Sequence, residues 1–308
     1  MKKKRIFITG AAGFIGSHLY EKLKKDGHDV KGIDNFFHSS SHPLAKEIEY
    51  ADVRYYQDIE PYVKWADEVF HLAAQIHVDK SITNPQETVD INITGTLNVL
   101  EAVRKYDKKM VFASSSEVYG TSQCEYMGED HPLDAQSPYA ASKVAGDRLC
   151  KSYFDTYGTK VAILRNFNTF GSYQADTSYG GAIGIFTRRA LQGERIELYG
   201  SGDQERDYMS VHDAIRGYEF CIERELWGRS VNIGTGKTIK IKELAETIKR
   251  LAGSESRIVH VEPRAGEVMR LCADTAFAES EGFKIENDFT NKLDEYVRWY
   301  EDSILPTL

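Results

Sequence analysis

The stretch Gly10-Ala-Ala-Gly13-Phe-Ile-Gly16 decides the fold of this 308-residue chain. It follows a β-branched run, Arg5–Thr9, and opens a segment in which Ile15, Leu19 and Leu23 recur at helical spacing. Glycines between a strand and a helix let the backbone turn tightly and approach a pyrophosphate, which the helix N-terminus stabilises with its free N–H groups and its dipole. The spacing GxxGxxG differs from the GxGxxG fingerprint, but the strand–turn–helix context predicts a dinucleotide-binding turn.

The next expected strand, Val30–Asp34, ends in a carboxylate. Beside an adenosine ribose, Asp34 can accept hydrogen bonds from the hydroxyl groups, and its charge would repel a 2′-phosphate. The sequence therefore predicts NAD rather than NADP as the cofactor.

Short β-branched or aromatic runs alternate with helical patterns through the first half of the chain. Further strands are expected at Glu68–Leu72, Met110–Ser114 and Val161–Asn166. Ser137-Pro138 marks a helix start, with a side-chain acceptor at the N-cap and proline where no donor is needed, and this helix should reach about Tyr157. The alternation predicts an α/β fold: a Rossmann-type doubly wound parallel sheet with helices on both faces.

The pattern changes after Gly171, where glycine and tyrosine become frequent. We expect residues 1–171 to form an NAD-binding Rossmann domain, to which about 211–240 return with the strand Ser230–Ile233. Residues 172–308 should mainly form a smaller C-terminal α/β domain that binds the substrate. Its expected helices include one with Ile241 to Leu251 and a last one with Leu293 to Tyr300.

Composition excludes several classes of function. The formal net charge of −8 argues against nucleic acid as a partner, because phosphate binding needs clustered Lys and Arg. We expect no membrane span, since no apolar run reaches the roughly 18 residues that a span requires. The basic start before a short apolar run does not fit a secretory signal. Four widely spaced cysteines without a CxxC pair favour reduced thiols in a cytoplasmic protein and give no support to a metal site.

A possible acid–base pair lies in Tyr139-Ala-Ala-Ser-Lys143, which places a phenol and an ammonium group on one helix face. A nearby cation, helped by a positive nicotinamide ring, should lower the pKa of Tyr139 and make its phenolate a usable base. Upstream, Ser115 follows the strand Met110–Ser114, at the end of the sheet where doubly wound folds bind ligands. Taken singly, Tyr139 could be a core aromatic residue and Ser115 a turn residue.

Together these motifs resemble the extended short-chain dehydrogenase/reductases of the nucleotide-sugar epimerase/dehydratase family. The similarity runs in family order from about residue 5 to residue 275 and is carried by GAAGFIG, Asp34, His71-Leu-Ala-Ala74, Asn92 with Gly95-Thr96, SSSEVYG, SPYAASK, Arg165-Asn-Phe-Asn168, Arg206-Asp207, Asn232-Ile-Gly-Thr-Gly236 and Arg264-Ala-Gly-Glu267.

The resemblance implies roles for named positions. It implies Ser115, Tyr139 and Lys143 as the catalytic triad. For the cofactor it implies Gly10, Gly13, Phe14, Ile15, Gly16, Asp34, Asn35, Asp52, Val53, Leu72, Ala73, Ala74, Asn92, Tyr139 and Lys143. For a nucleotide-diphosphate sugar it implies Ser81, Ser116, Asn168, Arg206 and Arg264, although each arginine could instead form an ion pair.

Family membership implies oxidation of the hexose at C4, and Glu117 bears on the step that follows. A 4-keto group acidifies the C5 proton, which a carboxylate can remove before the C6 hydroxyl is lost. The family's 4,6-dehydratases resemble this chain in having glutamate at that position, and we read Glu117 as a catalytic residue. Ser116 stands where some dehydratases have aspartate, so the residue that acts as the C6 acid stays open.

The main expectation is thus an NDP-hexose 4,6-dehydratase, with an NDP-hexose 4-epimerase as the alternative. A UDP-glucuronate decarboxylase and a non-catalytic NAD-sensing protein are weaker alternatives. Glu117 could also be a structural carboxylate that accepts backbone N–H bonds. The family resemblance implies a homodimer that pairs the helices near Gln86–Lys105 and Ser137–Tyr157.

Overall fold

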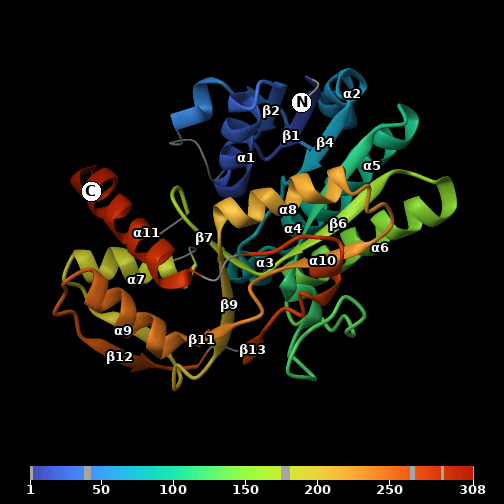
Figure 1. The fold of residues 1–308 in the computed structure, drawn as a ribbon. Helices are drawn as coiled ribbons and strands as arrows, with labels where there is room; N and C mark the ends of the chain where they lie inside the picture. Colours follow the sequence, from blue (N-terminus) through green and yellow to red (C-terminus); the bar gives the residue numbers. More distant parts are fainter. Residues whose placement is uncertain (1–2, 38–42, 175–180, 264–267, 286–287, 308) are drawn as a thin grey trace.

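A computed structural model describes residues 3–37, 43–174, 181–263, 268–285 and 288–307 (Figure 1). Its centre is one parallel seven-stranded sheet in the order β10-β6-β5-β4-β1-β2-β3. The strands are β1 (Arg5–Thr9), β2 (Asp29–Asp34), β3 (Glu49–Tyr50), β4 (Glu68–His71), β5 (Lys109–Ser115), β6 (Val161–Asn166) and β10 (Ser230–Ile233). The expected doubly wound parallel sheet is confirmed, and the ends of its six expected strands differ from expectation by at most one residue; the two-residue β3 was not expected.

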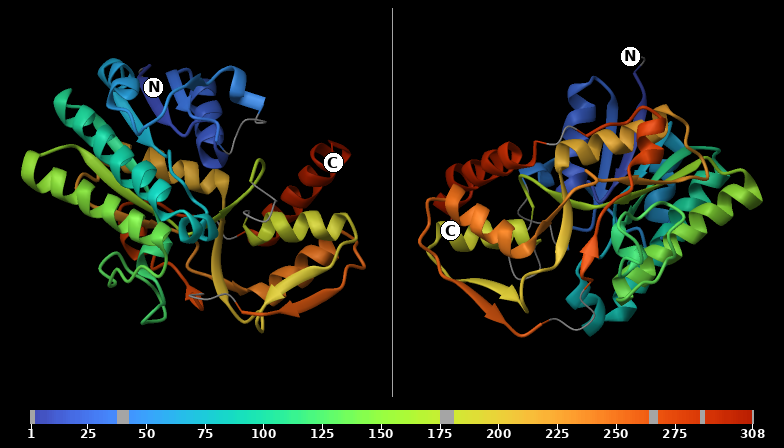
Figure 2. Two further views of the ribbon diagram at one scale, coloured as in Figure 1. Left: turned by 180° about the vertical axis from the view of Figure 1, so that it is seen from behind. Right: turned by 60° about the horizontal axis from the view of Figure 1, so that its bottom comes forward.

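Helices cover both faces of the sheet (Figures 1 and 2). On one face lie α1 (Phe14–Lys25) and α8 (Val211–Glu223), which pack against each other. On the other lie α2 (Tyr56–Trp65), α5 (Gly95–Lys105) and α6 (Pro138–Tyr157). Between β4 and α5 the chain forms α3 (Val78–Thr83), α4 (Pro85–Val89) and one π-helical turn, η2 (Asp90–Thr94). Buried Leu19 and Leu23 of α1 confirm the helical spacing in the sequence.

The long helix α6 begins and ends where local chemistry requires. The Ser137 hydroxyl accepts a hydrogen bond from Ala140 N at 3.1 Å, and Pro138 occupies the first turn. The helix stops at Gly158, whose φ of 68° suits the left-handed conformation that ends many helices. In Figure 2, α5 and α6 lie side by side along one side of the molecule.

The strand order reverses between β1 and β4. From β1 the chain builds outward through β2 and β3 to one edge, and from β4 it builds through β5, β6 and β10 to the other. In open parallel sheets, ligands bind outside the carboxyl ends of the strands at such a reversal. The glycine turn after β1 and the segment Leu72–Ala74 after β4 both lie there.

A smaller α/β layer is built mainly from the C-terminal part (Figure 1). The strand β9 (Glu205–Ser210) pairs with β7 (Asn168–Phe170), β11 (Thr238–Lys240) and β13 (Arg270–Leu271), and β8 (Ile196–Tyr199) pairs with β12 (Ile258–Val261). The helices are α7 (Ala182–Leu191), α9 (Ile241–Leu251) and α11 (Phe289–Ser303), whereas the short α10 (Ala276–Ser280) packs against β10 of the large sheet. Leu244, Ile248, Leu293 and Tyr296 fill a core between α9 and α11.

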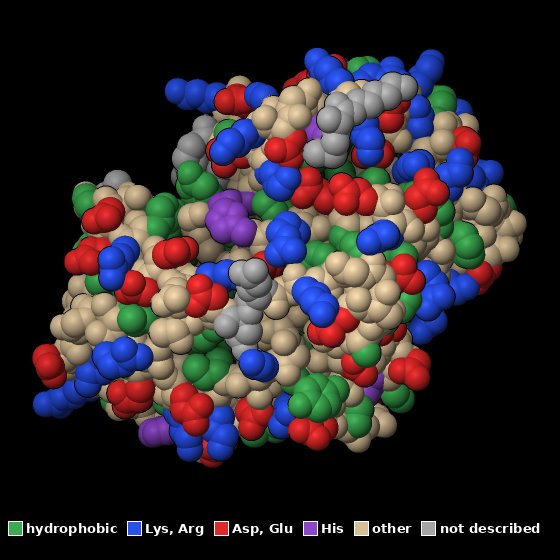
Figure 3. All heavy atoms as spheres, viewed as in Figure 1, with side chains coloured by type: hydrophobic (Ala, Val, Ile, Leu, Met, Phe, Trp, Pro, Cys, Tyr) green, Lys and Arg blue, Asp and Glu red, His purple; other side chains and the backbone are tan. Residues whose placement is uncertain are grey.

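The surface carries mixed charge. On the face drawn in Figure 3, basic and acidic side chains are interspersed, without a continuous basic stripe of the kind that binds nucleic acid. Among the described helices, none is both long and apolar enough to cross a membrane.

Candidate active site

The glycine turn between β1 and α1 is closed so tightly that Gly10 and Gly16 leave no room for a side chain. The Gly13 amide donates to Gly10 O at 3.1 Å, and a Cβ on Gly16 would lie 2.1 Å from the same oxygen. A Cβ on Gly10, where φ is 71°, would lie 2.7 Å from Ala73 N. The turn therefore presses against the exit of β4, and the amides of Phe14, Ile15 and Gly16 begin a helix with no side-chain cap. This cradle fits a pyrophosphate.

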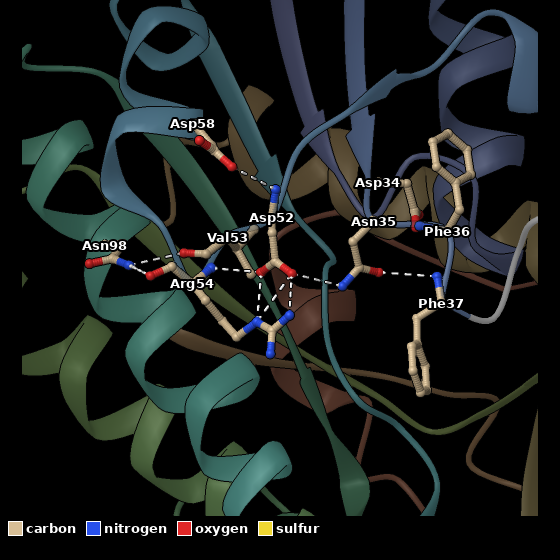
Figure 4. Close-up of polar contacts among 9 residues, drawn as sticks. All are labelled: Asp34, Asn35, Phe36, Phe37, Asp52, Val53, Arg54, Asp58 and Asn98. Carbon is tan, nitrogen blue, oxygen red and sulfur yellow. Dashed lines mark hydrogen bonds and ion pairs between the residues drawn. The ribbon is translucent and has the colours of Figure 1, made fainter.

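The end of β2 supports this turn. The Asp34 carboxylate accepts hydrogen bonds from Ala12 N at 3.2 Å and from Phe36 N at 2.8 Å. It thus ties the turn after β1 to the turn after β2, in addition to the ribose contact expected from the sequence. The neighbouring Asn35 donates to Asp52 Oδ2 at 3.1 Å and accepts from Phe37 N at 3.2 Å (Figure 4).

Arg54 is a residue of this end of the site that sequence reasoning missed. Its Nη2 donates to Asp52 Oδ2 at 2.6 Å, and its backbone N donates to Asp52 Oδ1 at 2.9 Å (Figure 4). Burial disfavours the charged form of Asp52, but hydrogen bonds from Arg54 and Asn35 outweigh it and lower the pKa of the carboxyl. Asn98 of α5 donates to the carbonyl oxygens of Val53 and Arg54. The spacing Asp52-x-Arg54, which overlaps the expected cofactor positions Asp52 and Val53, could have indicated this pair in the sequence.

Behind Leu72–Ala74, a buried polar network fixes the backbone. Thr9 Oγ1 lies 2.7 Å from His71 Nδ1 and accepts from Ala73 N at 3.2 Å. Burial and the nearby Lys143 charge lower the pKa of His71 to about 3, so the ring is neutral.

Asn92 lies in the π-helical turn, and its side-chain amide forms hydrogen bonds with other residues of the protein. It accepts from Gln75 N at 2.7 Å and donates to Gln75 O and to Ser142 Oγ. The residue expected to contact the cofactor therefore joins the segment after β4 to α6.

Three catalytic candidates converge at the carboxyl end of β5. Ser115 ends β5 and caps the short helix η3 (Ser116–Tyr119) by accepting from Glu117 N at 3.2 Å. Tyr139 and Lys143 occupy one face of α6 and are 8% and 4% exposed. Ser115 interacts with the Tyr139 phenol and opposes the rise that burial causes in its pKa. Lys143 Nζ donates to Ala113 O of β5 at 2.9 Å.

The predicted lowering of the Tyr139 pKa counts on the charge of the nicotinamide ring, and the protein by itself acts in the opposite direction. Burial raises the pKa of Tyr139 to about 12; Ser115 opposes this rise, and the negative charge of Glu117 adds a smaller increase. Burial also lowers the pKa of Lys143 to about 8. Desolvation acts against both charged forms and is the largest cause of both pKa shifts.

The expected sugar-binding positions divide into three groups. Asn168 on β7 donates to Asp207 O at 3.3 Å, and half-buried Arg206 lies on the adjacent strand β9, so these two are brought together. Ser81 and Ser116 are 0% and 3% exposed, which leaves them little surface for a ligand. Arg264 lies outside the described residues.

Asp207, next to Arg206, organises the strand that carries the arginine. Its buried carboxylate accepts from Thr235 N and Gly236 N, both at 2.9 Å, and from Ala273 N at 3.2 Å. Burial raises the pKa of this carboxyl. It therefore links β9 to the turn after β10 and to the segment after β13.

Comparisons with known proteins agree with this geometry. The profile of the NAD dependent epimerase/dehydratase family matches residues 6–234. The chain belongs to this family. Its members use NAD, and the glycine cradle and Asp34 fit that cofactor.

Relatives of this chain within the family carry out different reactions. The chain is 37% identical over 97% of its length to a putative UDP-glucose 4-epimerase of Methanocaldococcus jannaschii, of which it covers 99%. It is 38% identical to a UDP-N-acetyl-alpha-D-glucosaminuronate decarboxylase of Bacillus cytotoxicus, with 84% of each chain covered. The crystal structure of UDP-glucose 4-epimerase from Thermotoga maritima, with UDP-glucose, has a TM-score of 0.91 and 28% identity, covering 97% of this chain and 99% of that one.

Proposed function

We propose that this enzyme is an NAD-dependent UDP-hexose 4-epimerase. The observation that carries the proposal is the similarity, over nearly the full length of both chains, to a putative UDP-glucose 4-epimerase. The site geometry supports it, because a phenol, a hydroxyl and an ammonium group lie at the carboxyl end of β5, where the family places its chemistry. The comparisons favour this alternative over the 4,6-dehydratase that was the main expectation from the sequence.

Each catalytic side chain has a defined task in this reaction. Tyr139 accepts the proton of the C4 hydroxyl and later returns it, and Ser115 interacts with the phenol. Lys143, four residues after Tyr139 on the same helix, supplies a positive charge. Bound NAD would supply hydride transfer at C4 and a positive charge that favours the phenolate. A 4-epimerase requires the keto sugar to present its other face before the hydride returns.

Asn168, Arg206 and Arg264 remain our proposed ligands for the diphosphate. Arginine offers planar pairs of donors that match phosphate oxygens, which supports this role for Arg206. We also keep the proposed division of the chain at residue 171, with 211–240 returning to the larger domain. The position of β10 in the large sheet and the packing of α8 on α1 support it.

The reaction is tested by incubating the enzyme, NAD and single UDP-hexoses or UDP-uronic acids in deuterium oxide. We expect a C4 epimer with unchanged mass and no deuterium at C5, since C4 oxidation and reduction leave the C5–H bond intact. Loss of carbon dioxide from a uronic acid would identify a decarboxylase instead. Mass spectrometry and NMR of the product distinguish these outcomes.

A 4,6-dehydratase is the second candidate, because Glu117 is close enough to Tyr139 for its charge to raise the pKa of the phenol. If Glu117 removes the C5 proton, the product lacks one water and carries deuterium at C5, and Glu117→Gln loses about 10²–10⁴ in rate. In a 4-epimerase, Glu117→Gln should retain activity within about tenfold, because no step removes a C5 proton. The paired results separate the two reactions.

We also propose that the enzyme is a homodimer. Val89 of α4, Leu97 of α5 and Tyr157 at the end of α6 are apolar or aromatic side chains that are 40%, 38% and 56% exposed. They lie on the helices that the family resemblance pairs across a dimer axis. We expect sedimentation equilibrium at micromolar concentration to give twice the chain mass. A monomer under those conditions would contradict the proposal.

A further inference from the structure

A buried ion pair joins α6, the helix of Tyr139 and Lys143, to β6, and no step described above uses it. Asp147 lies one helical turn after Lys143 on α6, and its Oδ2 accepts from Arg165 Nε of β6 at 2.7 Å. The two side chains are 2% and 3% exposed. Buried ion pairs often contribute little net stability compared with apolar residues, so stability alone is a weak reason for this pair.

Arg165 extends the contact to the other catalytic element. Its Nη1 donates to Tyr119 Oη and to Glu129 O, both at 2.9 Å. Tyr119 is the last residue of η3, the short helix that Ser115 caps and that contains Glu117. Tyr119 in turn donates to Asn232 Oδ1, at the end of β10. A continuous set of buried hydrogen bonds therefore joins the helix of Tyr139 and Lys143 to the turn of Ser115 and Glu117.

The charges around Lys143 give Asp147 a second task. His71 of β4 and Cys150 of α6 are neutral near pH 7, because burial lowers the pKa of the histidine and raises that of the thiol. Glu117 of η3 acts on Tyr139. Burial lowers the pKa of Lys143, and Asp147 is the largest opposing influence.

Burial raises the pKa of Asp147, and the charges of two arginines, Arg165 of β6 and Arg148 of α6, act to lower it. The Arg165 guanidinium stays protonated. The 2.7 Å contact with a guanidinium that stays charged favours the carboxylate form of Asp147 against this burial, one helical turn from Lys143.

We propose that Asp147 and Arg165 are positioning residues of the catalytic site. Arg165 holds the Ser115 turn in register with α6, and Asp147 keeps Lys143 in its ammonium form. This inference deepens the proposed function and rests on it for the role of Lys143.

The test uses the full-length, NAD-loaded enzyme and three variants. Asp147→Asn removes the carboxylate, Arg165→Lys keeps the charge but loses the planar set of donors, and Asp147→Asn with Arg165→Gln restores neutrality to the buried pair. Arg189→Gln is the control, since it breaks a half-buried pair with Glu197 in the smaller layer, away from α6. Each protein is measured by thermal unfolding, by kcat and KM across pH, and by the ¹⁵N titration of Lys143 Nζ without substrate.

We expect Lys143 to titrate about one pH unit lower in Asp147→Asn and in the neutral pair, because the charge that favours the ammonium form is gone. Lys143 is charged below its pKa, so activity should be lost as pH rises, and the alkaline limb of kcat should move down with the titration. On that limb the rate should fall about tenfold. Arg165→Lys should lower kcat with little change in KM, and Arg189→Gln should match the unaltered enzyme.

If a single variant unfolds, the double variant Asp147→Asn with Arg165→Gln still tests the proposal. A purely structural pair would change the unfolding temperature and leave the Lys143 titration and the alkaline limb where they are, and that result would overturn the proposal. The NMR titration needs no substrate. An enzyme that converts no UDP-sugar would therefore contradict the proposed function, while the effect of Asp147 on Lys143 would still be measured.

Discussion

Tyr139→Phe should remove nearly all turnover of the enzyme while leaving its fold and NAD affinity intact. The hydroxyl is the only group lost, and Tyr139 is 8% exposed and interacts with Ser115. Removal of a general acid–base group typically costs about 10²–10⁴ in rate. Because the ring remains, packing should be unchanged. The measurements are kcat on a UDP-hexose, NAD affinity by fluorescence and the unfolding temperature.

Tyr153→Phe is the matched control, because it removes a phenolic hydroxyl from the same helix, where that group donates to Glu101 of α5. It should keep kcat near that of the unaltered enzyme. If Tyr139→Phe retained full activity, Tyr139 could not be the proton acceptor, and the proposed mechanism would be wrong.

Gly16→Ala should have the largest effect of any single methyl group added to the cofactor site. The new Cβ would lie 2.1 Å from Gly10 O and 2.9 Å from Gly10 C, both backbone atoms that cannot rotate away. The start of α1 must then move from the turn. Overpacking of this kind costs about 1–3 kcal/mol. Each lost hydrogen bond to a charged pyrophosphate costs about 1.5–3 kcal/mol, so NAD affinity should fall at least about tenfold.

Gly13→Ala separates strain in the protein from contact with the ligand. Its Cβ would meet Gly10 O at 3.2 Å, and its φ of −76° is open to any residue. We expect its unfolding temperature without NAD to stay close to that of the unaltered enzyme, whereas Gly16→Ala should unfold several degrees lower. Calorimetry and NAD titration check both. Equal stability and equal NAD affinity for Gly16→Ala would show that the turn is not closed as described.

The sequence and the comparisons favour different reactions after C4 oxidation. Glu117 favoured a dehydratase, because a carboxylate after the serines fits removal of a C5 proton. Its position in η3 beside Tyr139 allows that role, but also allows a charge that acts on the phenol. One residue type at one position does not identify a reaction in this family. The similarity over the whole chain favours the epimerase.

The sequence by itself determined those features that depend on neighbours along the chain. Ser137 and Pro138 start α6, and Gly158 ends it, because capping and the left-handed conformation are local requirements. The strands and the glycine turn follow from apolar runs and backbone freedom over a few residues. The family's motifs are local in the same sense, which is why cofactor and fold could be predicted.

Only the tertiary structure decided contacts between residues far apart in sequence, and the charges that burial controls. The approach of Gly10 to Ala73, the bond of Asn92 to Ser142 and the pair Asp147–Arg165 each join separate strands or helices. No local pattern shows that two such groups will meet. The directions of the Tyr139 and Lys143 pKa shifts also arise from desolvation, which depends on the surrounding chain and not on their four-residue spacing.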